Sequence, residues 1–188
     1  QTVGGVGMNL AVRKGSAADN ADGDTSGSDE GGGYSVVLTA GADVTGVDGL
    51  DMGIGYGEQE AGQQAAAGHQ MRYNEDYTIF AKYAIGSVTV GAQRNYISKG
   101  SKGTASQEAD LYAIAFNVND NLAISYGEKK TEFMNASSAH TDEKVSGVAV
   151  SYTMGSMKIA GNRNEVTHNG GTINSNDEMT EIALSFAF

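Results

Sequence analysis

Residues 77–96 read YTIFAKYAIGSVTVGAQRNY, and this stretch decides the fold. Mostly apolar residues stand at every second position before Gly86-Ser87 and again after it, with small or polar residues between them. A period of two is that of a β-strand, whereas an amphipathic helix repeats about every 3.6 residues. A Gly-Ser pair between two such runs is typical of a tight turn. The stretch therefore predicts an antiparallel hairpin with one apolar face and one face of small and polar residues.

The same alternation recurs along the whole chain and predicts ten strands. Their centres lie near Leu10, Leu38, Ile54, Ile79, Val90, Ile114, Ile124, Val150, Ile159 and Leu184. Long connections rich in Gly, Asp, Ser and Asn are expected near 15–33, 58–75, 99–107, 131–141 and 166–177. Tight turns are expected at 86–87, 119–121 and 155–156, with a longer connection at 41–49. This pattern predicts one all-β domain over residues 1–188, an antiparallel up-and-down meander with long loops at one end.

Composition excludes several classes of protein. The 188 residues include 27 Gly but no Pro, Cys or Trp, and 12 basic against 23 acidic side chains give a formal charge of −11. Without cysteine there is no disulfide framework or thiolate metal site, and so acidic a chain is a poor binder of duplex DNA. No apolar run approaches the roughly 20 residues of a membrane-spanning helix. Because the chain begins at Gln1 without a start Met or a secretion signal, we expect it to be processed or a piece of a longer protein.

The two faces of the predicted strands differ in a way that suggests a membrane barrel. One face carries Val, Ile, Leu, Met, Phe and Tyr, and the other carries mostly Gly, Ala, Ser, Thr and Asn. Such small polar residues suit the wall of a water-filled lumen, so we expect the apolar face to meet lipid. The residues expected to line the pore are Arg13, Asp51, Lys82, Gln93, Asn95, Lys129 and Lys158. Their charges would bias which solutes pass, or would only keep the lumen wet.

Tyrosines gather near the ends of the apolar face. Tyr34, Tyr56, Tyr77, Tyr96 and Tyr112 stand towards the long loops, and Tyr83, Tyr152 and Phe188 stand towards the short turns. Tyrosine favours the membrane–water boundary, where its ring lies in hydrocarbon and its hydroxyl reaches water. The sequence therefore predicts two aromatic girdles.

The final segment, Glu178 to Phe188, alternates aliphatic or aromatic residues with small ones and ends on Phe. It resembles the C-terminal strand of Gram-negative outer-membrane general porins, and residues 53–57, 122–127 and 147–152 resemble porin strands of the alphaproteobacterial type. The resemblance implies a transmembrane β-barrel for passive diffusion of small hydrophilic solutes and ions, without a cofactor. It also implies a homotrimer in contact with lipopolysaccharide. The assembly signal read by the barrel-assembly machinery would be Ile182, Leu184, Phe186 and Phe188.

The strand count departs from this family, whose barrels have 16 strands. A ten-stranded barrel is only slightly wider than the eight-stranded size whose interior side chains fill. Residues such as Gly53, Gly91 and Ala113 would not fill it, so we expect the chain to be the C-terminal part of a wider channel. The family's constriction loop is then not in this sequence, and its residues are not carried over.

Two arginines and one acidic loop depart from the simple pattern. Arg94 and Arg163 fall on the apolar face. They would contact lipopolysaccharide phosphates or a neighbouring subunit, or else mark a strand end or an error in the expected register. The loop at 19–30 has five carboxylates, and part of it resembles the opening of an EF-hand. Its twelfth position is Gly33 instead of Glu, which favours a solvated acidic loop over a dedicated calcium site, with weak surface calcium binding as the alternative.

Signals of an enzyme are weak. His69, His140 and His168 fall in predicted loops, where His140 with Asp142 could imitate an acid–base pair, and no catalytic motif is present. We therefore expect no enzyme. Two alternatives to a porin remain, a small outer-membrane barrel that serves as an adhesin or anchor, and a soluble Gly-rich β-sandwich or filament subunit.

Overall fold

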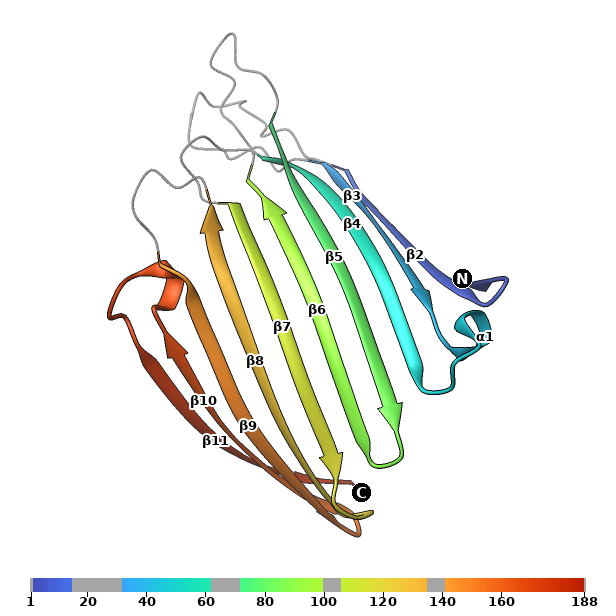
Figure 1. Ribbon diagram of the computed structural model, residues 1–188, viewed down its shortest axis with the longest axis vertical. Coiled ribbons are helices and arrows are strands. Elements are labelled where there is room, and N and C mark those ends of the chain that lie inside the picture. Colours follow the sequence, from blue (N-terminus) through green and yellow to red (C-terminus); the bar gives the residue numbers. More distant parts are fainter. Residues whose placement is uncertain (1, 15–31, 62–71, 100–105, 135–140, 188) are drawn as a thin grey trace, which may run out of the picture.

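The chain folds as one continuous antiparallel sheet whose strands follow in sequence order (Figure 1). A computed structural model describes residues 2–14, 32–61, 72–99, 106–134 and 141–187. The strands are β1 (Thr2–Val3), β2 (Val6–Arg13), β3 (Gly33–Ala40), β4 (Leu50–Ala61), β5 (Arg72–Ile85), β6 (Val88–Ser98), β7 (Ser106–Asn117), β8 (Leu122–Met134), β9 (Glu143–Met154), β10 (Met157–Thr167) and β11 (Asp177–Phe186).

The prediction of an all-β meander is confirmed. Each of the ten predicted strand centres lies in one of the ten long strands, β2 to β11. Every strand pairs with the next one along the chain. The two-residue strand β1 and a short helix, α1 (Ala42–Thr45), were not predicted. No helix in the described ranges is both long and apolar enough to cross a membrane.

The tight turns lie where glycine and asparagine predicted them, together at the lower end of the sheet in Figure 1. Gly86 and Gly155 have φ angles of 57° and 59°, which non-glycine residues rarely adopt. In the β7–β8 turn, the Asn119 side chain accepts hydrogen bonds from the backbone N–H groups of Asn121 and Leu122, each at 2.9 Å. Side-chain and backbone chemistry at these few positions therefore reverses the chain.

The sheet is open over the described residues. β11 pairs only with β10, and β1 pairs only with β2, so the two chain ends lie at opposite edges (Figure 1). The expected closure into a barrel is therefore not part of this structure.

The sheet is a single layer without a hydrophobic core. None of the hydrophobic side chains in the described part is buried, and Leu10, Ile79 and Leu184 are 64%, 56% and 55% exposed. A soluble domain removes such surface from water by packing a second layer on it. Because the described residues supply no second layer, the apolar face of this sheet needs a cover from outside.

Candidate functional site

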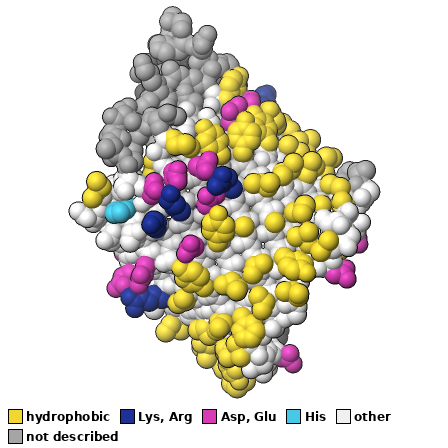
Figure 2. Space-filling model, viewed as in Figure 1, with side chains coloured by type: hydrophobic (Ala, Val, Ile, Leu, Met, Phe, Trp, Pro, Cys, Tyr) yellow, Lys and Arg dark blue, Asp and Glu magenta, His cyan; other side chains and the backbone are white. Residues whose placement is uncertain are grey.

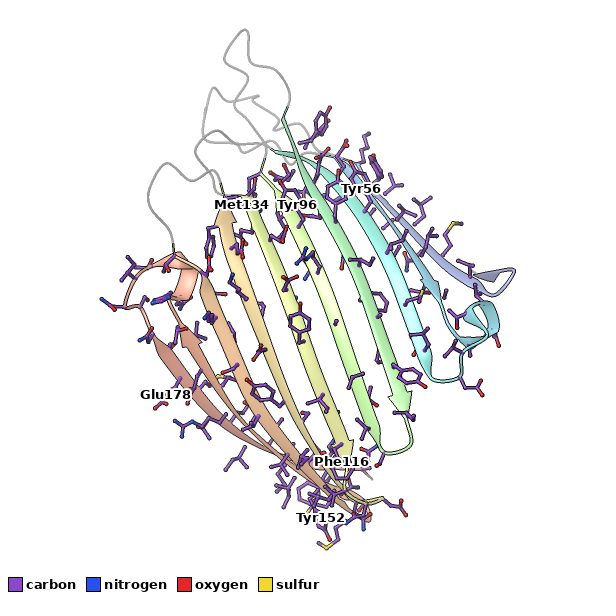
Figure 3. The ribbon with its side chains drawn as sticks, in the orientation of Figure 1. Tyr56, Tyr96, Phe116, Met134, Tyr152 and Glu178 are labelled. Carbon is purple, nitrogen blue, oxygen red and sulfur yellow. The ribbon has the colours of Figure 1, made fainter. Side chains whose placement is uncertain are left out.

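Four predicted girdle tyrosines form a row across the apolar face. Tyr34, Tyr56, Tyr77 and Tyr96 come from the adjacent strands β3 to β6 (Figure 3). Successive ring centroids lie 5.9, 5.0 and 6.1 Å apart, with the planes tilted by 48–57°. Tilted pairs at this distance are favourable contacts between aromatic rings. The row stiffens this part of the sheet and marks a line on its apolar face.

From β6 to β9 the same face carries a group of charged residues, which begins at Arg94, two residues to the short-turn side of Tyr96. Arg94 forms a two-bond pair with Asp110, at 2.6 and 2.7 Å, and approaches Glu108 at 3.5 Å. Lys130 pairs with Glu132 at 2.6 Å and Asp142 at 3.0 Å. Figure 2 shows these charges gathered as an island beside the hydrophobic surface. We call these residues the charged island.

Arg163 belongs to a second, smaller group of charges on β10 and β11. It pairs with Glu178 at 2.7 Å and Glu165 at 3.3 Å. Arg94 and Arg163 both point to the apolar face, as the alternation predicted, so an error in the expected register is ruled out. Sequence reasoning missed the acidic partners because they lie on other strands or towards the strand ends.

The line between apolar and charged positions does not follow the hydrogen-bond register. Tyr56, Tyr77 and Tyr96 lie level with one another. Tyr96, however, is opposite Glu108, and the tyrosine of β7 is Tyr112, four residues nearer the short turns. The line has therefore moved along the strand between β6 and β7.

From β7 to β11 the boundary between apolar and charged positions continues to shift towards the short turns. Glu128 lies opposite the β7 tyrosine, and the β8 tyrosine, Tyr126, is two residues nearer the short turns and level with Val148. Arg163 lies opposite Val148, so uncharged positions on this face of β10 begin only at Gly161, two residues further. In β11 the apolar positions begin at Ile182, level with Gly161, because Thr180 opposite Arg163 is polar.

At the other edge the movement has the same direction. Tyr34 lies opposite Glu58, so Tyr56 is two residues nearer the short turns. From β3 to β11 the boundary moves by about ten residues along the strands over eight strand-to-strand steps. With about 3.3 Å per residue and about 4.8 Å between strands, the boundary is inclined by about 40° to the direction of the hydrogen bonds. The apolar surface is therefore bounded by a diagonal.

The short-turn end is displaced in the same direction. Ile85, the last residue of β5, is level with Val88 and Phe116, and β7 continues one residue past Phe116, to Asn117. Phe116 is level with Val150 through β8, and β9 runs four residues beyond Val150 to Met154. The apolar positions therefore form a diagonal band between two roughly parallel limits.

A repeated Tyr-Gly-Glu sequence marks the upper limit of this band. In β4 the Tyr56 hydroxyl donates to Glu58 at 2.9 Å, and in β8 the Tyr126 hydroxyl donates to Glu128 at 3.0 Å. The intervening glycine faces the other side of the sheet, so tyrosine and glutamate are neighbours on one face. This repeat could have located the boundary from the sequence, because the glutamate directly follows the segments that resemble porin strands.

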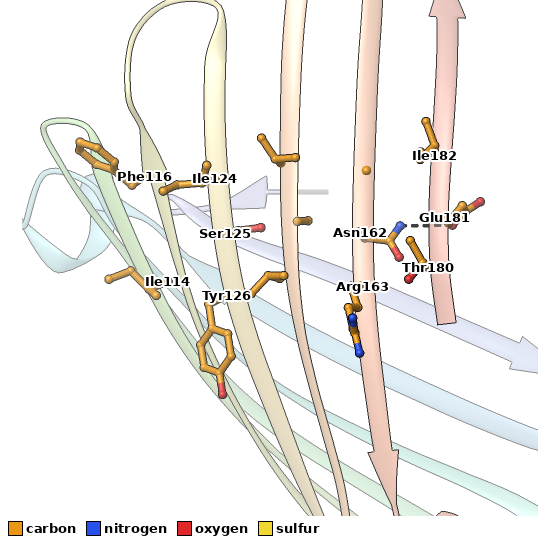
Figure 4. Close-up of a pocket in the computed structure, with 14 residues that line it drawn as sticks. Ile114, Phe116, Ile124, Ser125, Tyr126, Asn162, Arg163, Thr180, Glu181 and Ile182 are labelled. Carbon is orange, nitrogen blue, oxygen red and sulfur yellow. Dashed lines mark hydrogen bonds between the residues drawn. The ribbon is translucent and has the colours of Figure 1, made fainter. Parts of the chain in front are cut away.

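The apolar band also holds a hollow of about 650 Å³ between β7 and β11 (Figure 4). It lies over Gly161, whose missing side chain leaves space between Val150 and Ile182. Arg163 and Thr180 stand at its long-loop side. Asn162 and Glu181 bond to each other at 3.2 Å (Figure 4). The hollow is apolar within the band and polar only at its rim.

The opposite, small-residue face carries the seven residues predicted to line a pore. Two of the predicted cations have acidic partners there, since Lys82 pairs with Asp51 at 3.0 Å and Lys129 pairs with Glu143 at 2.9 Å. Gln93 donates to the Asn95 side chain at 2.8 Å. Two of the four cations predicted to line the pore are thus paired with carboxylates. Glu143 was not predicted, because its contact with Lys129 depends on the register of β8 and β9.

Glu143 holds the end of this face to the β10–β11 connection. Its carboxylate accepts from the backbone N–H of Gly170 in η1 (Asn169–Gly171) at 2.9 Å as well as from Lys129. Partial burial alone would raise its pKa, but the bonds from Gly170, Lys129 and Thr131 outweigh burial and hold the pKa below its ordinary value. At the charged island, the carboxylates of Glu132 and Asp142 raise the pKa of Lys130.

The remaining predicted sites gain little support. The acidic loop at 19–30, His69, His140 and Phe188 lie outside the described residues. Asp142 pairs with Lys130, and His168 has its ring Nδ1 3.2 Å from the Asp142 carbonyl oxygen. In the described ranges no three His, Cys, Asp or Glu side chains are placed to hold a metal ion.

Three of the four predicted assembly residues lie in the described part of the last strand and are exposed. Ile182, Leu184 and Phe186 are 78%, 55% and 54% exposed on one face of the edge strand β11. Comparison with known proteins matches the chain to no protein-family model and to no curated protein. Function is therefore inferred from the geometry of the two faces.

Proposed function

We propose that the chain forms part of the wall of a β-barrel channel in the outer membrane of a Gram-negative bacterium. Small hydrophilic solutes and ions diffuse passively through this channel. The single observation that carries the proposal is the diagonal apolar band. Strands of membrane barrels are tilted by about 35–45°, so a flat membrane must cross their register as a diagonal. The slope of about 40° derived from the tyrosines and first charged positions matches that tilt.

The band also accounts for charges on a face that meets lipid. An arginine at the membrane midplane costs roughly 2–4 kcal/mol and much less near the interface. Arg94 lies two residues to the short-turn side of Tyr96, paired with Asp110, whereas Lys130 and Lys144 lie beyond the line, and all three cations are on the register row of Ile79. In the proposed orientation this row leaves the hydrocarbon as it passes from β5 to β9.

The small-residue face supports a water-filled lumen. Glycine and alanine there leave space, and hydrogen-bonded polar side chains keep the wall wettable. A closed wall is required in lipid because unpaired backbone groups at a sheet edge are costly there. We propose that the open sheet is part of such a closed wall, and that the barrel is wide because these side chains do not fill a narrow one.

Two single-cysteine variants test the membrane placement, and the absence of native cysteine makes labelling specific. Ile79→Cys and Lys144→Cys lie on one register row and one face. In lipid vesicles, a fluorophore at position 79 should be quenched by bromine-labelled lipid chains, and one at position 144 by aqueous iodide. Equal quenching at both positions would refute the diagonal placement.

Planar-bilayer recording tests the channel itself. The purified protein should give stable conductance steps. A correctly placed but silent barrel would favour the adhesin or anchor alternative, and a protein that is extracted without detergent would favour the soluble one.

A further inference from the structure

A bulky aromatic residue interrupts the small-residue face. Phe80, on β5, is half-buried and points to this face, between Thr78 and Lys82. Directly opposite is Gly53 of β4, and a Cβ added there would lie 2.6 Å from the Phe80 ring carbon Cε1. The ring therefore extends over the glycine, which is buried, while Phe80 itself stays partly exposed and lines a hollow on this face.

The Phe80 ring lines a hollow on the small-residue face. This hollow has a volume of about 1170 Å³, and Phe80, Leu111 and Val145 are apolar residues of this face that line it. A row of small residues, Gly91, Ala113 and Gly127, lies beside them at the level of Lys82. The hollow thus combines an apolar patch with free space, the usual composition of a small-molecule site.

Hydrogen-bond donors and acceptors lie next to the Phe80 ring. Lys82 follows Phe80 on the same face and pairs with Asp51, and each side chain is 54% exposed. The pair can therefore donate and accept further bonds. Gln93, opposite Phe80, adds an amide. Because Lys82 and Lys129 each have an acidic partner, the hollow offers strong hydrogen bonds without a large unbalanced charge.

We infer that this hollow is a weak binding position for neutral polyhydroxylated solutes, of which hexose sugars are the simplest. A pyranose ring has an apolar C–H face, which fits the exposed part of Phe80, and hydroxyls at its edge, which fit Asp51, Lys82 and Gln93. A small ion lacks the apolar face and gains little there. The inference rests on the proposed function, because solutes reach this face only through an open lumen.

Two measurements on the purified full chain test the inference with D-glucose as the probe. Saturation-transfer NMR, in a detergent without a sugar headgroup, should show transfer from the protein to glucose. Single-channel recording should show a glucose-dependent reduction of ion current. The Phe80→Ala variant should weaken glucose binding by about threefold to tenfold, the range expected for loss of one aromatic contact.

Val37→Ala is the matched control, because Val37 is an apolar residue of the same face but lies outside the hollow. It should leave glucose binding unchanged, and Phe80→Tyr should retain binding. The double variant Asp51→Asn, Lys82→Gln should weaken binding while the ring remains. A gel-mobility shift on boiling checks that each variant is folded.

The outcomes separate this inference from the proposed function. Conductance without any glucose effect, or a glucose effect that Phe80→Ala leaves unchanged, would overturn the sugar site and leave the channel intact. Phe80-dependent saturation transfer without conductance would retain the binding site and refute the channel.

Discussion

Individual glycines on the small-residue face have different tasks. Gly53 lies beneath Phe80 and against the Leu38 carbonyl oxygen, which a Cβ would approach to 2.8 Å. At Gly91 a Cβ would meet only the Ala81 carbonyl oxygen, at an ordinary 3.7 Å. Gly53 is therefore needed for close packing of the backbone, whereas Gly91 only leaves space.

We therefore expect Gly53→Ala to destabilise the fold by about 1–3 kcal/mol, because a backbone oxygen has no way to move aside cheaply. Gly91→Ala should change stability by well under that amount. Urea unfolding of the two variants in the same lipid checks the difference. Equal losses of stability would show that the predicted contact with Gly53 is absent.

Glu143 is expected to make stability depend on pH. Its pKa is lowered in the folded state, so its contribution is complete well above 4.5, the ordinary value, and is lost as the pH falls through the folded-state pKa. The urea midpoint should therefore fall more steeply in acid for the native chain than for Glu143→Gln. Parallel pH profiles for the two proteins would contradict this role.

At the scale of strands, alternation of side chains predicted much of the fold. Period-two patterning located all ten long strands, because each strand has one apolar face and turns rich in Gly and Asn separate them. The diagonal band was not predicted. It depends on which residue of one strand faces which residue of the next, and partners such as Tyr96 and Glu108 are related only through the register. The ion pairs of Arg94 and Lys129 were missed for the same reason.

Two substitutions on one face of β11 test the band at this scale. Leu184 lies within the band, and Thr180 lies beyond its boundary, level with Arg163. In a bilayer, Leu184→Arg should cost roughly 2–4 kcal/mol of folding free energy, and Thr180→Arg should cost about 0–1 kcal/mol. Denaturant titration in lipid vesicles measures both. A similar cost at the two positions would place the membrane boundary elsewhere.

For the whole molecule, the turns give the wall two distinct ends. The 86–87 and 155–156 turns lie at one end of the sheet, and the β10–β11 connection lies at the other. If the wall spans a membrane, the two ends face different compartments.

Single cysteines at Ser87, Ser156 and Asn174 check this orientation, since all three residues are exposed. In sealed vesicles with one protein orientation, a membrane-impermeant maleimide should label positions 87 and 156 together and position 174 from the opposite side. Labelling of all three from one side would exclude a spanning wall.

The free edge at β11 has a consequence for the behaviour of the protein in water. An outer strand offers a row of unsatisfied N–H and C=O groups, and soluble proteins usually guard such a strand with lysine or proline. β11 has neither, and the chain has no proline at all. We therefore expect copies of the open sheet in water to associate through their edge strands. If the sheet closes into the proposed barrel, pairing of β11 removes this edge, so we expect association between copies to be confined to protein that has not yet closed.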